Sequence, residues 1–296
     1  MSTLTQNRAG GYDWLNVWRE MYDVERAQGE AATDPAFERA ADIWASRANR
    51  YAVASRRHPQ PDAFMAALTP HLRPTDRVLD VGAGTGRYLP YLAAHVAEVI
   101  AVEPSSAMRS QLEQTVRELA LTNVQLIADH WPPAQLPRAD VVLSAHVVYG
   151  VREIGPFLMA LNQAATRLCA LYLGLEHPTS ALAPFWSRVH GEVRRSLPGA
   201  LEAVAVCHQL GLPARLDLLP APEAFRFANS TEALEEIRIR LRLTPEPTRD
   251  AVILAAMTEL LVPVADGQLV PRAQPRYNGL VWWYPEPIAP VGTAAG

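Results

Sequence analysis

The chain begins with apolar positions that recur at the period of an α-helix. Trp14, Val17, Trp18 and Met21 follow one another at steps of three and four, which places them on one helical stripe. A second stripe covers residues 37–44 and follows an Asp-Pro pair that is typical of a helix start. The pattern predicts a layer of helices at the start of the chain.

From residue 77 the pattern changes to short apolar runs that alternate with helical periodicity. We expect strands in "RVLDVG", "EVIAVEP", "VQLIAD", "ADVVLSA" and "RLCALYLGLE", and helices around residues 85–95, 105–119 and 153–166. Uninterrupted apolar strands between helices are typical of parallel sheets that are covered on both faces. The fold class predicted here is therefore α/β, with a doubly wound, mostly parallel sheet.

Beyond residue 177 this alternation ends. Helical periodicity is found in "APFWSRVHGEVRRSL", "ALEAVAVCHQLG", "STEALEEIRIRL" and "TRDAVILAAMTELL", and a late strand is expected in "NGLVWWYP". That late strand could be the last core strand of the sheet, or an edge strand at which two copies of the chain form a dimer. The final residues are rich in Pro, Gly and Ala and predict a loose tail.

Composition narrows the classes of partner. The formal net charge is −4 without a long run of either sign, which disfavours nucleic acid and membrane surfaces as partners. Cys169 and Cys207 lie in apolar sequence and are interpreted as buried side chains, so no metal site is expected. No signal segment and no apolar stretch of about 20 residues is found, and a cytoplasmic location is expected.

The stretch "DVGAGTG" carries the first functional signal. It follows a predicted strand and leads into a helix that we expect to begin near Thr85. Backbone N–H groups that point out of such a turn, at the positive end of a helix dipole, favour an anionic ligand group. Asp80 at the end of the strand is placed to hold a cationic amine.

Glu103 supplies the second signal. It ends the next predicted strand, about 20 positions after Gly82, where doubly wound folds place the acid that accepts the ribose hydroxyls of an adenosine ligand. The glycine spacing is G-x-G-x-G, whereas dinucleotide sites use G-x-G-x-x-G. This spacing disfavours a nicotinamide-dependent oxidoreductase.

Four segments together resemble a known family. "VLDVGAGTGRY", "VIAVEPSSAM", "VQLIADHWPP" and "ADVVLSAHVVYGV" are similar, in order and spacing, to the motifs of class I S-adenosylmethionine-dependent methyltransferases. The resemblance covers roughly residues 77–176. It implies a seven-stranded, Rossmann-like sheet closed by an antiparallel strand at "GLVWWYP", with S-adenosylmethionine as cofactor and S-adenosylhomocysteine as product.

The resemblance also implies a cofactor site. Its residues would face the methionine end, the ribose and the adenine in turn, and Tyr51 of the N-terminal layer would cover the cofactor. The methionine end would be met by Asp80, Gly82, Ala83, Gly84 and Gly86, and the ribose by Glu103. The adenine and the floor would be met by Pro104, Met108, Asp129, His130, Trp131, Ser144 and Ala145.

The acceptor side is less defined by the sequence. Methyl transfer is an in-line displacement, and a base is needed only if the acceptor is protonated at the working pH. We take His146, His177 and His190 as candidate bases, with packing or capping as the alternative for each. The segment 181–210 carries aromatic and basic residues that suit an anionic or aromatic small molecule, or simply form a solvated helix face.

These observations give one leading function and two alternatives. The leading one is transfer of a methyl group to an oxygen or nitrogen of a small-molecule acceptor. The alternatives are a non-catalytic interaction or regulatory protein with the same fold and, less favoured, a nicotinamide-dependent oxidoreductase. We expect a helical layer or lid over residues 1–72, a cofactor-binding core over 73–177, acceptor-side helices and closing strands over 178–284 and a tail over 285–296. The oligomeric state is open, a homodimer being one option.

Overall fold

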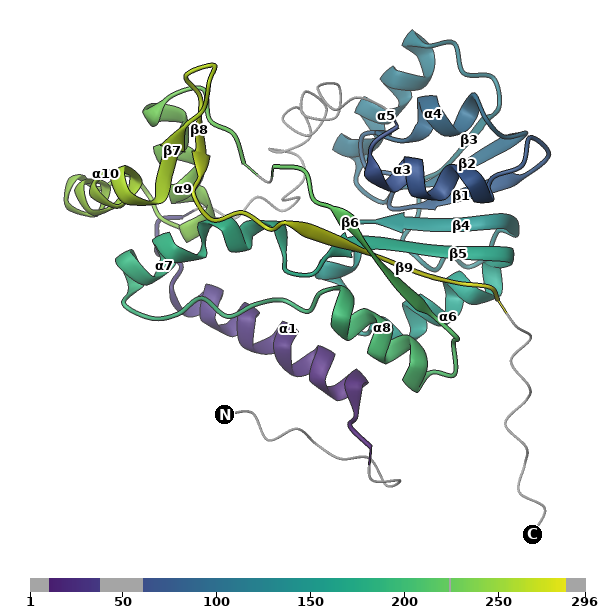
Figure 1. The fold of residues 1–296 in the computed structure, drawn as a ribbon, viewed down its shortest axis with the longest axis horizontal. Helices are drawn as coiled ribbons and strands as arrows, with labels where there is room; N and C mark the ends of the chain where they lie inside the picture. Colours follow the sequence, from purple (N-terminus) through teal and green to yellow (C-terminus); the bar gives the residue numbers. More distant parts are fainter. Residues whose placement is uncertain (1–10, 38–60, 224, 286–296) are drawn as a thin grey trace.

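The computed structural model describes residues 11–37, 61–223 and 225–285, and its central element is a seven-stranded sheet (Figure 1). The strand order is β3-β2-β1-β4-β5-β9-β6. The strands are β1 (Arg77–Val81), β2 (Glu98–Val102), β3 (Val124–Ile127), β4 (Ala139–Ala145), β5 (Ala165–Gly174), β6 (Arg215–Pro220) and β9 (Tyr277–Trp283). A separate two-stranded sheet is formed by β7 (Leu261–Pro263) and β8 (Leu269–Pro271).

The sheet is parallel except at one strand. β1 to β5 pair in parallel with their neighbours, whereas β9 is antiparallel to both β5 and β6. The expected strand in "NGLVWWYP" is therefore an interior strand of the sheet. The predicted doubly wound α/β fold, closed by an antiparallel strand from the C-terminal part, is confirmed.

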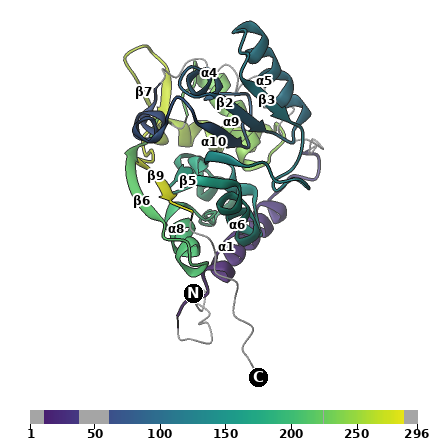
Figure 2. The same ribbon diagram turned by 90° about the vertical axis from the view of Figure 1, so that its right-hand side faces the viewer.

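Helices cover both faces of the sheet (Figure 2). Along β1 the side chains alternate: Leu79 and Val81 join the hydrophobic cluster on the face of α6 and α8, and Val78 joins the cluster of the opposite face. The helices are α1 (Trp14–Ala31), α3 (Ala63–Leu68), α4 (Leu89–Ala93), α5 (Ser106–Glu118), α6 (Ile154–Ala164), α7 (Ala183–His190), α8 (Ala200–Gln209), α9 (Ser230–Leu241) and α10 (Pro247–Leu260). Three 3₁₀ turns are η1 (Thr69–His71), η2 (Val148–Gly150) and η3 (Pro178–Leu182).

The helix after β1 begins later than the sequence predicts. It starts at Leu89 rather than near Thr85 and has only 5 residues. Gly84 and Gly86 both have positive φ, which a right-handed helix does not tolerate, so the chain stays in a loop until Pro90 supports the first turn. The expected helix start near Thr85 is thus wrong by about one turn.

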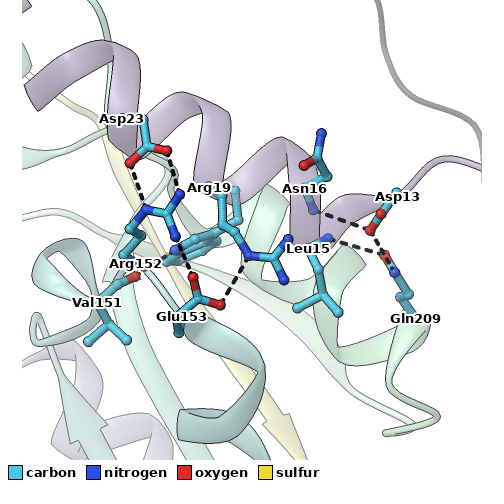
Figure 3. Close-up of polar contacts among 10 residues, drawn as sticks. Asp13, Leu15, Asn16, Arg19, Asp23, Val151, Arg152, Glu153 and Gln209 are labelled. Carbon is cyan, nitrogen blue, oxygen red and sulfur yellow. Dashed lines mark hydrogen bonds and ion pairs between the residues drawn. The ribbon is translucent and has the colours of Figure 1, made fainter. Parts of the chain in front are cut away.

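α1 lies along α6 and α8 (Figure 1). Within its predicted stripe, Trp18 is completely buried, whereas Trp14, Val17 and Met21 are half-buried. Polar contacts fix the helix at its outer side: Arg152 pairs with Asp23 and with Glu153 (Figure 3). The second predicted stripe, residues 37–44, falls almost wholly outside the described residues.

α7, α9 and α10 form a lobe beyond the end of the sheet, together with the β7-β8 hairpin (Figure 1). The helices were expected from periodicity, but the hairpin was not. The lobe has a hydrophobic cluster of its own, in which Phe185 and Trp186 are almost fully buried. Packing within the lobe therefore accounts for the aromatic residues of the segment 181–210.

Candidate functional site

The glycine loop joins β1 to α4. Gly82 has φ of +76°, and a Cβ atom at this position would lie 2.4 Å from Cγ2 of Val147. Gly84 has φ of +58°, and a Cβ atom there would meet no atom within 4 Å. The first glycine is thus required by the fold, while the second borders open space in which a ligand can approach the backbone.

The N–H groups of this loop are already bonded within the protein. Gly82 and Ala83 both donate to the Val102 carbonyl oxygen, at 2.8 and 3.1 Å, and Gly84 donates to Oε2 of Glu103 at 2.9 Å. The sequence predicted that these groups point out toward an anion at a helix N-terminus. That prediction is wrong for these three residues, because the loop folds its donors back onto β2.

Glu103 is held at the end of β2, where the sequence predicted the ribose-binding acid. Its side chain is buried, and its oxygens accept from the N–H groups of Gly84 and of Ser105, the latter at 2.8 Å. A carboxylate has about four acceptor sites, and these two bonds orient it at the end of β2. The backbone around Glu103 therefore fixes the position of its carboxylate.

Asp80 is the buried acid at the end of β1. It is only 2% exposed, and desolvation together with the nearby Glu103 charge raises its pKa to about 7. A cationic group placed beside Asp80 would stabilise its ionised form. The pair of acids thus fits a ligand that carries both an ammonium group and a diol.

The other predicted cofactor residues line the ends of β2, β3 and β4. Met108 is buried on α5, Pro104 is exposed, and the Ser144 hydroxyl donates to the Val81 carbonyl oxygen at 2.9 Å. That bond ties β4 to β1 where the loop begins, and Ala145 follows, half-buried. Ser144 thus acts on the floor of the site by joining strands.

Asp129, His130 and Trp131 follow β3. Asp129 and His130 are exposed, and the His130 N–H donates to Oδ1 of Asp129 at 2.7 Å. The Trp131 indole packs toward α6, where its N–H lies 3.3 Å from the Phe157 carbonyl oxygen. Trp131 therefore anchors this loop to α6. Tyr51 lies outside the described residues.

His146 lies at the acceptor end of the site. It follows β4 with φ of +59°, and its Nδ1 is 3.2 Å from the hydroxyl of Tyr149. The Tyr149 oxygen accepts from the Gly174 N–H at 2.6 Å, and the ring of Tyr172 lies 5.0 Å from that of His146. Burial, with a smaller effect of the Arg87 charge, lowers the pKa of His146 to about 4. His146 is therefore neutral near pH 7.

His177 joins this cluster, and His190 does not. The ring of Tyr149 contacts that of His177 at 4.6 Å, but Nδ1 of His177 accepts from the Thr179 N–H and caps η3. His190 stacks on Trp186 in the lobe, and its Nε2 lies 3.3 Å from the Leu241 carbonyl oxygen. The structure thus brings together two of the three candidate bases.

Two basic residues of segment 181–210 are engaged elsewhere. Arg188 pairs with Glu259 of α10, and Arg194 stacks on Trp186 and pairs with Glu25 of α1. These contacts fix the lobe to itself and to α1, so they favour the structural interpretation of this segment over an acceptor pocket.

Sequence reasoning missed Arg87 and Asp62, which form an ion pair of 2.6 Å next to the glycine loop. The signal for Arg87 was its position directly after Gly86. Asp62 precedes α3 and caps it, a role that gives no sign of the site in the sequence.

Among the residues that the structure describes, no group of three or more potential metal-ligating side chains occurs. None of the described helices combines the length and apolarity that crossing a membrane requires.

Comparisons with known proteins give a domain match and a shared fold. Residues 78–167 match the family model described as a methyltransferase domain. No curated protein matches the sequence. Two solved structures share the fold: a proposed methyltransferase of Bacillus halodurans, with 14% identity over 76% of this chain and 100% of that one at a TM-score of 0.52, and the YcgJ protein of Bacillus subtilis, with 14% identity over 75% and 98% at 0.50.

Proposed function

We propose that this chain is a class I S-adenosylmethionine-dependent methyltransferase that transfers the methyl group of that cofactor to an oxygen or nitrogen atom of a small-molecule acceptor. The match of residues 78–167 to a methyltransferase domain supports the proposal. When bound, the cofactor supplies an electrophilic methyl group on a sulfonium. The protein's own contribution is then to hold the acceptor in line and to exclude water.

The cofactor fits the residues that surround the glycine loop. Asp80 suits the ammonium of the methionine end, and the carboxylate of Glu103 suits the ribose hydroxyls, which donate to carboxylate oxygens. Gly84 borders open space next to these residues in the loop. We assign the remaining cofactor contacts to Pro104, Met108, Asp129, His130 and Ala145 as proposals on the same basis.

The observation that carries the acceptor side is the placement of His146. It directly follows β4, the strand next to β1, and its ring is neutral at physiological pH and partly exposed. Tyr149 fixes the Nδ1 side of the ring, which leaves Nε2 as the nitrogen that faces an acceptor. We propose that His146 removes the proton of a hydroxyl or amine acceptor, with Tyr149 as its positioning residue.

His177 and His190 are proposed in other roles. His177 borders the cluster through Tyr149 and caps η3, so it would shape the pocket. His190 would act in lobe packing. We further propose that residues 1–72 contribute the lid over the cofactor. Residues 178–284 would contribute the acceptor side, although Arg188 and Arg194 of this range are engaged in ion pairs within the protein.

The first test is calorimetric titration with S-adenosylhomocysteine, with Glu103→Ala as the variant and NAD as a control ligand. We expect binding to the unaltered protein, weakening by about 1–3 kcal/mol in the variant, and no binding of NAD. An absence of S-adenosylhomocysteine binding would contradict the proposed function.

The second test follows product formation on a panel of small hydroxyl and amine acceptors. His146→Ala should lower turnover by roughly 100-fold or more, while His190→Ala should leave it unchanged. Equal turnover in the two variants would remove His146 from the mechanism.

A further inference from the structure

Arg87 lies directly after the glycine loop, and its side chain is 22% exposed. Its Nη2 donates to Oδ2 of Asp62 at 2.6 Å. Asp62 also accepts from the Met65 N–H through Oδ1 and from the Tyr88 hydroxyl through Oδ2. The carboxylate of Asp62 is thus also bonded to α3 and to Tyr88. It meets the guanidinium through one nitrogen, Nη2, rather than through two parallel hydrogen bonds.

The Nε of Arg87 is buried and has no hydrogen-bond partner. A guanidinium carries five N–H donors, and a buried donor without a partner costs free energy comparable to a lost hydrogen bond. This cost is recovered if a second planar acceptor binds along the Nε edge. Carboxylates match that edge with two parallel hydrogen bonds.

Packing places Arg87 on the same side of the sheet as the proposed base. The guanidinium lies 5.2 Å from the ring of Tyr88, and Phe64 contacts both Tyr88 at 5.4 Å and Tyr172 at 4.6 Å. Tyr172 in turn contacts His146. The Arg87 charge reaches far enough to lower the pKa of His146, which agrees with this arrangement.

The glycine loop does not offer the backbone N–H groups that an anionic ligand was expected to use. The N–H groups of Gly82, Ala83 and Gly84 are bonded to β2 and to Glu103. A carboxylate that enters the site must therefore find a donor elsewhere, and Arg87 is a cation next to the loop in the part of the chain that the structure describes.

We propose that Arg87 is the carboxylate-binding residue of this site, with Asp62 as the group that orients it. This inference rests on the proposed function. It adds one contact to that function, between Arg87 and a carboxylate of a ligand. The carboxylate has two sources, the methionine end of the cofactor or an acceptor that carries a carboxylate. The two sources share the same chemistry and differ in which ligand loses affinity when Arg87 is replaced.

The experiment compares Arg87→Met and Arg87→Lys with the unaltered protein in two titrations. S-adenosylhomocysteine is measured against 5′-methylthioadenosine, which lacks the amino-acid group. Protein saturated with S-adenosylhomocysteine is then titrated with benzoate and with benzamide. Arg87→Lys retains the positive charge but lacks the planar pair of N–H donors. It also provides a second variant in case Arg87→Met does not fold. Arg77→Met, at the far end of β1, is the matched control.

A loss of roughly 10- to 100-fold in affinity for S-adenosylhomocysteine, with methylthioadenosine unchanged, would support the proposal and assign the cofactor carboxylate. An unchanged cofactor affinity with a selective loss of benzoate binding would support it and assign the acceptor. If neither selective loss occurs while both nucleosides still bind, Arg87 has no such role. Failure of the unaltered protein to bind either nucleoside would instead overturn the proposed function itself.

Discussion

The indole N–H of Trp18 donates a hydrogen bond of 2.8 Å to the backbone carbonyl of Val151, 133 residues further along the chain. Trp18 is fully buried and belongs to the same hydrophobic cluster as Leu79 and Val81 of β1. Val151 directly follows η2, the turn that contains Tyr149. One side chain thus joins the N-terminal helix to the segment that carries the proposed base.

Replacing Trp18 should therefore destabilise the fold strongly. Trp18→Ala removes a large buried side chain and leaves a cavity, and we expect a loss of about 3–5 kcal/mol in the free energy of unfolding. Trp18→Phe keeps most of the volume but leaves the Val151 carbonyl unpaired, at a cost of about 1–3 kcal/mol. Urea denaturation followed by circular dichroism measures both. A smaller loss in the alanine variant than in the phenylalanine variant would contradict this account.

The ion pairs at the outer side of α1 should contribute far less. Arg152 bonds Asp23 at 2.7 and 2.8 Å and Glu153 at 2.5 Å, but these side chains are about half exposed (Figure 3). Exposed pairs are screened by water and salt. We expect Arg152→Met to leave the denaturation midpoint unchanged within error. A shift as large as that of Trp18→Phe would show that these pairs, rather than the indole, hold α1.

Much of the fold was accessible from the sequence because its signals are local. The apolar runs of β1 to β5 and the positions of Glu103 and Asp80 depend on strand patterning and on spacing to the glycines. The late start of α4 and the bonding of loop N–H groups to Val102 were not accessible. They depend on how a loop with positive φ values meets a neighbouring strand, which no periodicity records.

The candidate bases illustrate the same limit. His146, His177 and His190 look alike in the sequence, and only tertiary packing separates them. His190 stacks on Trp186 in a lobe whose helices were expected but whose packing was not, and His177 caps η3. Asp62 and Arg87 escaped notice because 25 residues separate them and their contact arises only when α3 folds against the loop.

The two glycines of the loop should respond differently to substitution. Gly82→Ala combines a positive φ with a contact of 2.4 Å to Val147, so we expect mainly a loss of stability. Gly84→Ala meets no protein atom within 4 Å, and its methyl group would extend into the space assigned to the cofactor. Its larger effect should be on affinity for S-adenosylhomocysteine. Thermal denaturation and calorimetric titration of both variants separate the two losses.

A matched variant tests the cause of the first loss. Val147→Ala removes the two methyl carbons that a Cβ at Gly82 would meet at 2.4 and 3.0 Å and keeps the Val147 Cβ at 3.3 Å, so the double variant should recover part of the stability lost in Gly82→Ala. Strictly additive losses in the double variant would mean that backbone strain alone is responsible.

The raised pKa of Asp80 predicts a pH dependence of cofactor binding. In the free protein, Asp80 is ionised only above about pH 7, whereas the ammonium of the ligand favours the ionised form. Binding below pH 7 must therefore release a proton, and affinity for S-adenosylhomocysteine should fall by up to about tenfold per pH unit as the pH is lowered from 7. Above pH 7 the affinity should level off.

Calorimetric titrations in two buffers with different ionisation enthalpies measure this proton release directly. The release should approach one proton per site near pH 6 and vanish near pH 8.5. Asp80→Asn should bind more weakly and lose the dependence, because an amide at this position neither titrates nor carries the charge that the ammonium requires. His146, whose pKa of about 4 lies below this range, cannot replace it as the titrating group. Proton release that persists in Asp80→Asn would therefore assign the linkage to another residue and remove Asp80 from the ammonium site.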